Sequence, residues 1–146
     1  MTHNFYIQVV LVSKDTILIK NYEQVLNASS KFLLTKDYDS ITAVLQKKDL
    51  LNTVSAFIFD AQTMGIQELV KLKTQVGSKK ILVVDSGPDN MVNILKIGVG
   101  GYLSRKHDYG SLLDFVWKVS NGEKALDQDS LKYLLQNLEK NMEPQL

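Results

Sequence analysis

The chain has 146 residues, of which 45% are hydrophobic and 23% charged, and its formal net charge at pH 7 is +1. These values are typical of one globular domain, and they exclude a disordered or fibrous chain. The absence of cysteine excludes disulfides and zinc–thiolate sites, while His3 and His107 lie too far apart for a metal-binding motif. The N-terminus has no signal-peptide pattern, and the apolar runs are too short to span a bilayer. We therefore expect a cytoplasmic protein with no membrane partner.

The N-terminal part of the chain alternates strand-sized apolar runs with stretches of helical period. The first predicted strand is Ile7–Val12, and Asp15 follows it as the expected N-cap of a helix with apolar residues up to position 26. A second strand is predicted at 32–35, and a second helix at 41–50.

The alternation continues to the C-terminus. The remaining predicted elements are a strand at 56–59, a helix at 69–76, a strand at 81–84, a helix at 91–97 closed by Gly98, a strand at 102–103, a helix at 112–119 closed by Gly122, and an amphipathic helix at 131–138. Five strands joined by short helical crossovers predict an α/β protein with a doubly wound, five-stranded parallel sheet and an extra C-terminal helix. We expect one domain over residues 1–122 and a linker helix over residues 123–146.

Polar residues follow the predicted strands, at the edge of the sheet where ligands of such folds bind. They are Ser13, Lys14 and Asp15 after the first strand, Asp60 after the third, Asp85 and Ser86 after the fourth, and Ser104, Arg105 and Lys106 after the fifth. No glycine-rich phosphate loop and no nucleophile–histidine–acid pattern accompanies them. We therefore expect neither an enzyme nor a bound cofactor.

Four segments at these strand ends resemble the receiver domain of response regulators, a flavodoxin-like (CheY-like) fold. They are LVSKD at 11–15, FIFDAQTMG at 57–65, ILVVDS at 81–86 and GVGGYLSRK at 98–106. The tail at 120–139 is similar to the receiver-to-effector linker of the NarL/FixJ (LuxR-type) class. The resemblance covers the chain from about residue 7 to residue 139.

The resemblance implies a role for three residues. Asp60 matches the phosphoacceptor aspartate, and Tyr102 matches the aromatic switch residue of the fifth strand. Arg105 falls where the family has a lysine. The resemblance thus implies a two-component signalling domain rather than a catalyst.

Other positions depart from the family pattern. Ser13 and Lys14 stand where the family has paired acids, and Asp85 stands where it has threonine or serine. Aspartyl phosphorylation needs a divalent cation held by hard oxygen ligands, and these changes remove carboxylates or add charge in the pocket. We therefore predict a degenerate receiver without a metal site, in which Lys14 and Arg105 pair with Asp60 and Asp85.

Two alternatives to a degenerate receiver remain open. The first is a phosphorylatable receiver in which Asp15 and Asp60 bind Mg²⁺ and a histidine kinase is the partner. The second is a small flavodoxin-like protein that binds a cofactor, although the chain lacks a phosphate-cradling loop. Under the lead interpretation, the signal is a small-molecule ligand, a protein partner or the expression level.

The C-terminal helix carries leucines at 131, 134, 135 and 138, which either close the core of this domain or form a dimer seam. We expect a homodimer as the output state. The chain ends about where a NarL/FixJ effector domain would begin and contains no helix-turn-helix pattern. We therefore expect it to be part of a longer transcription regulator, which contacts DNA only through an effector domain outside this chain.

Overall fold

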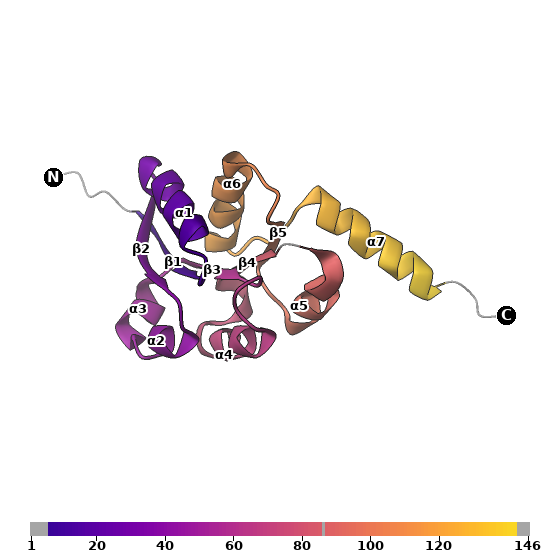
Figure 1. Cartoon of the computed structure of the whole chain (residues 1–146), viewed down its shortest axis with the longest axis horizontal. Coiled ribbons are helices and arrows are strands. Elements are labelled where there is room, and N and C mark those ends of the chain that lie inside the picture. The colour runs from indigo at the N-terminus through magenta and orange to yellow at the C-terminus, as the bar shows by residue number, and fades with distance from the viewer. Residues whose placement is uncertain (1–5, 86, 143–146) are drawn as a thin grey trace.

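The computed structural model describes residues 6–85 and 87–142 and contains the predicted parallel sheet, with helices on both faces (Figure 1). Its strands are β1 (Ile7–Val12), β2 (Phe32–Tyr38), β3 (Ala56–Asp60), β4 (Ile81–Asp85), β5 (Gly101–Ser104) and β6 (Ala125–Leu126). They lie in the order β2-β1-β3-β4-β5-β6, and all pair in parallel. The predicted fold class is confirmed. The two-residue strand β6, in a segment predicted to be only a connection, is an addition to the five expected strands.

The helices are α1 (Thr16–Ala28), α2 (Ile41–Leu45), α3 (Lys48–Thr53), α4 (Ile66–Val76), α5 (Met91–Ile97), α6 (Tyr109–Ser120) and α7 (Gln128–Met142), with short 3-10 turns at Ser78–Lys80 and Pro88–Asn90. The single helix predicted at 41–50 is wrong, because Lys47 interrupts it with an extended ψ of 70° and separates α2 from α3. Strand β2 is longer than the predicted 32–35. A bulge between Val9 and Val10 shifts its pairing with β1 past Thr35 and lets it continue to Tyr38.

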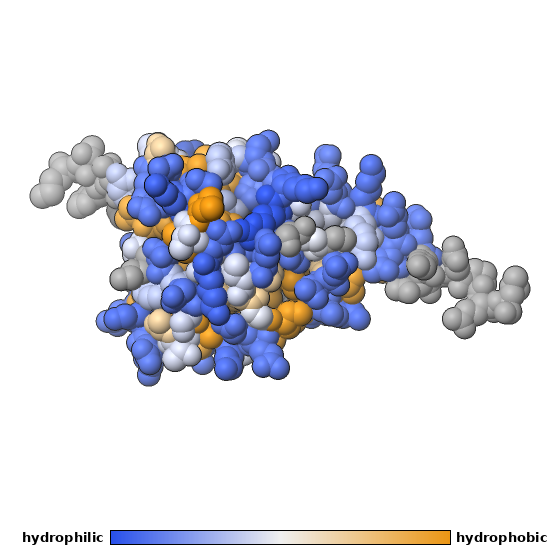
Figure 2. Space-filling view, in the orientation of Figure 1, coloured by the Kyte–Doolittle hydropathy of each residue, from blue (hydrophilic) through white to orange (hydrophobic). Residues whose placement is uncertain are grey.

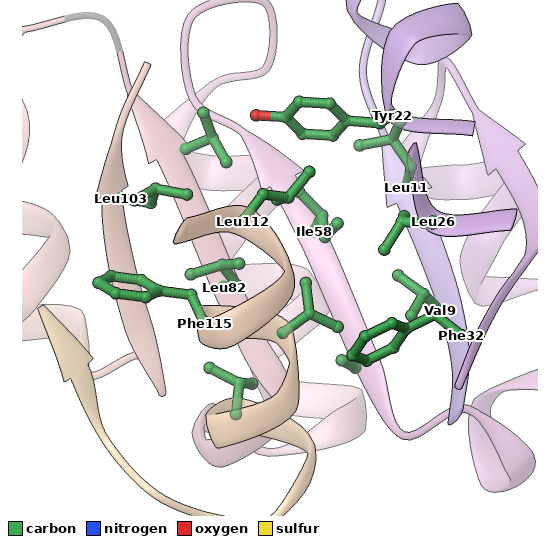
Figure 3. Close-up of a cluster of buried hydrophobic side chains, with 14 of the residues drawn as sticks. Val9, Leu11, Tyr22, Leu26, Phe32, Ile58, Leu82, Leu103, Leu112 and Phe115 are labelled. Carbon is green, nitrogen blue, oxygen red and sulfur yellow. The ribbon is translucent and has the colours of Figure 1, made fainter. Parts of the chain in front are cut away.

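Two hydrophobic clusters, one on each face of the sheet, form the core. Helices α1 and α6 cover one face, where Leu26, Phe32, Ile58 and Leu112 meet (Figure 3). Helices α2 to α5 cover the other face (Figure 1). Strands β3 and β4 are buried along their whole length, as central strands covered on both sides must be.

The parallel arrangement brings the carboxyl ends of β1, β3, β4 and β5 to one edge of the sheet. Hydrophilic residues gather near the middle of the viewed face in Figure 2, where these ends lie. The polar strand-end residues therefore share one site.

Gly98 ends α5 with φ +88° and Gly122 follows α6 with φ +79°, as the sequence predicts for glycine stops.

Candidate functional site

Asp60 lies at the centre of the site, where β3 ends. Asp60 is 0% exposed. Both oxygens of its carboxylate accept hydrogen bonds from the protein. Oδ1 accepts from the Arg105 guanidinium at 2.8 Å and from the backbone N–H of Gln62 at 3.1 Å. Oδ2 accepts from the hydroxyls of Ser13 at 2.7 Å and Thr63 at 2.9 Å. An ionised carboxylate offers about four acceptor positions, so the protein's own donors occupy all those of Asp60.

The two hydroxyls are held in the donating role by the backbone. Asp15 N–H donates to Ser13 Oγ at 3.0 Å, and Lys14 N–H donates to Thr63 Oγ1 at 3.0 Å. Since each hydroxyl oxygen accepts from the β1–α1 loop, its single hydrogen is directed at Asp60. Such chains of hydrogen bonds polarise one another and strengthen the contact with the carboxylate.

Arg105 joins two carboxylates that belong to different elements. One terminal nitrogen contacts Asp60, and the other contacts Oδ2 of Asp15. The second oxygen of Asp15 caps α1 by accepting from the backbone N–H groups of Ile17 and Leu18, which confirms the predicted N-cap. The guanidinium is only 20% exposed, and it supplies the positive charge between Asp15 and Asp60.

The predicted pairing of charges is therefore correct for Arg105 with Asp60 and wrong for Lys14. The Lys14 side chain is exposed, and it forms no ion pair within residues 6–85 and 87–142. Ser13, the buried neighbour of Lys14, reaches Asp60 instead. The physical reason is the alternation of side chains along an extended segment, which directs Ser13 inward and Lys14 outward.

Asp85, at the end of β4, bonds to Tyr102 rather than to the predicted cations. The Tyr102 hydroxyl donates to Asp85 Oδ2 at 2.8 Å and also lies 3.1 Å from the carbonyl oxygen of Gly87. Burial of the ring, followed by the hydrogen bond to Asp85 and its charge, raises the pKa of Tyr102 well above its ordinary value. Tyr102 therefore keeps its proton and acts as the donor. The predicted member Ser86 lies outside the described residues.

Sequence reasoning missed several residues of the site. Thr63 is within the segment that resembles the family, but no role was assigned to it; its spacing from Asp60, typical of a turn in which a side chain caps the backbone, is the available signal. His107 is half-buried. Its Nδ1 faces the carbonyl oxygen of Ser104 at 2.7 Å, and its Nε2 lies 2.8 Å from the Tyr22 hydroxyl. These contacts tie α1 to the loop after β5.

A cleft of about 250 Å³ opens beside the contact between Tyr22 and His107. Asp15, Tyr22, Arg105 and His107 are among the residues that line it. Burial raises the pKa of Tyr22 above its ordinary value, so its hydroxyl remains a donor to His107. The cleft lies at the carboxyl ends of the strands, where ligands of such folds bind.

The residues present do not fit a magnesium site. Within the described part of the chain, no three His, Asp or Glu side chains are grouped so that they could hold a metal ion. The two nearest carboxylates, Asp15 and Asp60, both contact Arg105, and their other oxygens accept backbone or hydroxyl hydrogens. A dication at this place would have to displace the guanidinium. We therefore derive no metal-dependent step here.

Trp117, on α6, is 43% exposed. The Lys31 ammonium lies 5.0 Å from its ring centroid, just before the start of β2. Trp117 is thus at the edge of the sheet opposite the strand ends. Its fluorescence is a poor reporter of events at Asp60.

Asp127 connects the site to the C-terminal helix. Its carboxylate accepts from the backbone N–H of Ser104, the last residue of β5, and from the N–H of Ser130 at 2.8 Å in the first turn of α7. Replacing Asp127 with alanine removes both bonds. We expect this change to lower the free energy of unfolding by about 1–2 kcal/mol and to speed hydrogen exchange in α7.

Urea unfolding and hydrogen exchange followed by mass spectrometry measure these effects of Asp127→Ala. Asp129→Ala, an exposed position in the same turn, is the matched control. Equal exchange in α7 for both variants would show that Asp127 does not anchor the helix.

The fold is the CheY-like receiver fold, a doubly wound parallel α/β sheet, with an additional C-terminal helix. A LuxR-family two-component response regulator from Aurantimonas sp. SI85-9A1 superposes with a TM-score of 0.80 at 14% identity, over 92% of this chain and 99% of that one. ChrA, a response regulator of a heme-sensing two-component system, gives 0.74 at 16% identity, over 97% and 68%. Salmonella typhimurium RcsB gives 0.78 at 16% identity, over 92% and 68%.

Comparison of the sequence with protein-family models and with curated proteins finds no match. The similarity therefore concerns the fold. Within the described residues, no helix has the length and apolar character needed to cross a membrane.

Proposed function

We propose that this chain is the regulatory domain of a cytoplasmic response regulator that signals without phosphorylation of Asp60. The observation that carries the proposal is the occupation of the Asp60 carboxylate. Phosphoryl transfer requires an oxygen of this group to be free as a nucleophile and a cation to neutralise the phosphoryl oxygens. Ser13, Thr63, Gln62 and Arg105 instead hold the carboxylate with four hydrogen bonds.

The internal cation supports the same proposal. Arg105 places a guanidinium between Asp15 and Asp60, and its planar fork bonds both carboxylates at once. A Mg²⁺ ion would have to compete for these two carboxylates with the Arg105 guanidinium, which is covalently part of the chain. The pocket is therefore assembled and partly neutralised in the absence of a phosphoryl group, which suits a domain held in one signalling conformation.

The proposed output is association rather than chemistry. Two copies of the chain form a homodimer, and this positions paired effector domains, outside this chain, on DNA half-sites. The solved RcsB dimers bound to DNA show that a protein of this fold acts as a DNA-bound dimer. A small ligand in the cleft beside Arg105, or a protein partner, would supply the signal.

The decisive test is a titration of the protein with Mg²⁺ and beryllofluoride, a mimic of the phosphoryl group, followed by amide NMR. We expect no saturable shifts at Asp60, Thr63 or Tyr102 at millimolar Mg²⁺. Saturable shifts that disappear in Asp60→Asn would contradict the proposal and establish a phosphorylatable receiver.

A variant that restores the family pattern supplies the positive arm of this test. The acid is introduced at Ser13 rather than at Lys14, because Ser13 contacts Asp60 whereas Lys14 is exposed. The variant combines Ser13→Asp, Arg105→Lys and Asp85→Thr. We expect it to bind Mg²⁺ and beryllofluoride. The absence of binding in a folded variant would show that residues other than these three prevent Mg²⁺ from binding.

A phosphorylatable receiver is the second candidate, because the carboxylates of Asp15 and Asp60 lie on either side of one guanidinium and are therefore close together. If Arg105 swings out, these two groups become available to Mg²⁺ and a histidine kinase becomes a partner. The same titration distinguishes the two candidates. The cofactor-binding alternative stays a prediction, which the absorption spectrum of the purified protein tests.

A further inference from the structure

Helix α7 is attached firmly to the sheet at its first turn. Strand β6 pairs with β5, and Asp127, directly after β6, bonds to the backbone of Ser104 and caps α7. The backbone N–H of Asp127 also bonds to the carbonyl oxygen of Tyr102 at 3.4 Å. This attachment gives each face of α7 a defined direction relative to the rest of the domain.

One face of α7 packs on the domain and a neighbouring face does not. Ser130 is buried, and Tyr133 and Leu134 pack against the cluster beneath α5 and β5. Leu131, Leu135 and Leu138 are 43%, 51% and 49% exposed. The sequence leaves open whether the leucines of this helix close the core or form a seam. In the structure, Leu134 packs against the core and the other three leucines remain uncovered.

The three uncovered leucines follow a coiled-coil spacing. The intervals from Leu131 to Leu135 and from Leu135 to Leu138 are those at which hydrophobic residues form one stripe along a helix that pairs with another helix. An exposed stripe of this kind on a projecting helix marks an interaction surface. Figure 1 shows α7 leading away from the body of the domain, so a partner helix has access along its length.

The charges beside the stripe identify the partner. Lys132 and Glu139 are one heptad apart, both are exposed, and both lie on the same flank of the leucine stripe. When two copies of α7 run antiparallel, Lys132 of each copy faces Glu139 of the other, and two opposite-charge pairs form. Parallel pairing would place these two residues, which share one heptad position, beside other positions of the partner helix and would form neither pair.

The shape of the molecule favours the same arrangement. Because α7 extends outward from its attachment near β5 (Figure 1), antiparallel pairing places the two domain bodies at opposite ends of the helix pair. Parallel pairing would bring both bodies to one end. We propose that α7 is a homodimerisation surface, which a second copy of this chain covers as an antiparallel helix with Leu131, Leu135 and Leu138 in the seam. The inference rests on the homodimeric output of the proposed function and adds its surface and orientation.

A charge exchange on the full chain tests this pairing by sedimentation velocity over a concentration series. Lys132→Glu or Glu139→Lys alone places like charges opposite each other twice, and we expect the dimer dissociation constant to rise about tenfold. The double variant Lys132→Glu/Glu139→Lys restores both pairs, so we expect a dissociation constant within about twofold of the parent. Lys71→Glu, an exposed charge change on α4, is the control.

The seam and its orientation have separate tests. Leu135→Glu is expected to abolish the dimer, whereas Val70→Glu, at a similarly exposed position on α4, should leave it intact. The chain has no native cysteine, so any disulfide that forms must join the introduced cysteines. A mixture of Lys132→Cys and Glu139→Cys chains should form the mixed disulfide in preference to either symmetric one.

The outcomes separate this inference from the proposed function. A dimer that is indifferent to Leu135→Glu and to all the charge variants would overturn the α7 seam and leave a homodimer formed by another face. A parent chain that stays monomeric at high micromolar concentration would overturn both the seam and the homodimeric output. In either case the beryllofluoride titration tests the state of Asp60 independently.

Discussion

Replacing Arg105 with alanine is expected to lower the free energy of unfolding by about 3 kcal/mol. Asp60 is 0% exposed and loses the cation that neutralises it, and Asp15 loses the same partner. Leaving a buried charge without its partner is among the few single changes with an effect of this size. Urea unfolding followed by far-UV circular dichroism measures the loss.

Two further variants show whether the loss comes from the carboxylates. Arg105→Lys keeps the charge but lacks the fork that bonds Asp15 and Asp60 together, so an intermediate loss is expected. In the double variant Arg105→Ala/Asp60→Asn the buried charge is also removed, and the combined loss should be smaller than the sum of the single losses. Additive losses, or a loss below about 0.5 kcal/mol for Arg105→Ala, would contradict the assignment of Arg105 as the internal cation.

Replacing Tyr102 with phenylalanine is expected to lower the free energy of unfolding by about 2 kcal/mol. The ring still fills its place in the core, but the buried carboxylate of Asp85 loses the hydroxyl that donates to it at 2.8 Å. Hydrogen bonds to charged groups contribute more than neutral ones, so the loss of this donor at a buried carboxylate is costly. Thermal and urea unfolding measure the change.

Tyr109→Phe is the matched control for Tyr102→Phe, because Tyr109 is 46% exposed and should tolerate the loss of its hydroxyl. The pair of variants also bears on the expected switch role of Tyr102. A rotating switch spends time with its hydroxyl away from Asp85, so Tyr102→Phe would then change stability little. Equal stabilities of the two variants would favour such a switch over the static hydrogen bond.

Some features of the site follow from local sequence. Asp60, Asp85, Tyr102 and Arg105 are predicted at one edge of the sheet because each belongs to an apolar run or comes shortly after one, and parallel strands end at the same edge. Asp15 was recognised as an N-cap because capping depends on a side chain and the backbone two or three residues later. Local geometry of this kind is encoded within a few residues.

Other features depend on contacts between distant segments. The second carboxylate that the Arg105 guanidinium contacts is that of Asp15, ninety positions away in the chain. Thr63 contacts Asp60 locally, but it also accepts from the backbone N–H of Lys14 because the loop after β3 lies against the loop after β1. Sequence spacing does not contain such distances, since they depend on how each loop closes over the sheet edge.

The sequence by itself determined the fold class, because apolar strands buried on both faces and amphipathic helices have few ways to pack within a chain of this length. It also determined that Ser13 and Lys14, rather than a pair of acids, follow the first strand, and that an arginine comes after the fifth strand. Only the tertiary structure decided which carboxylates that arginine neutralises, that Ser13 rather than Lys14 faces Asp60, and which leucines of α7 remain uncovered. The physical reason is that burial and hydrogen bonding between elements depend on how their side chains are oriented across the sheet. Hydrophobic periodicity contains no information on that orientation.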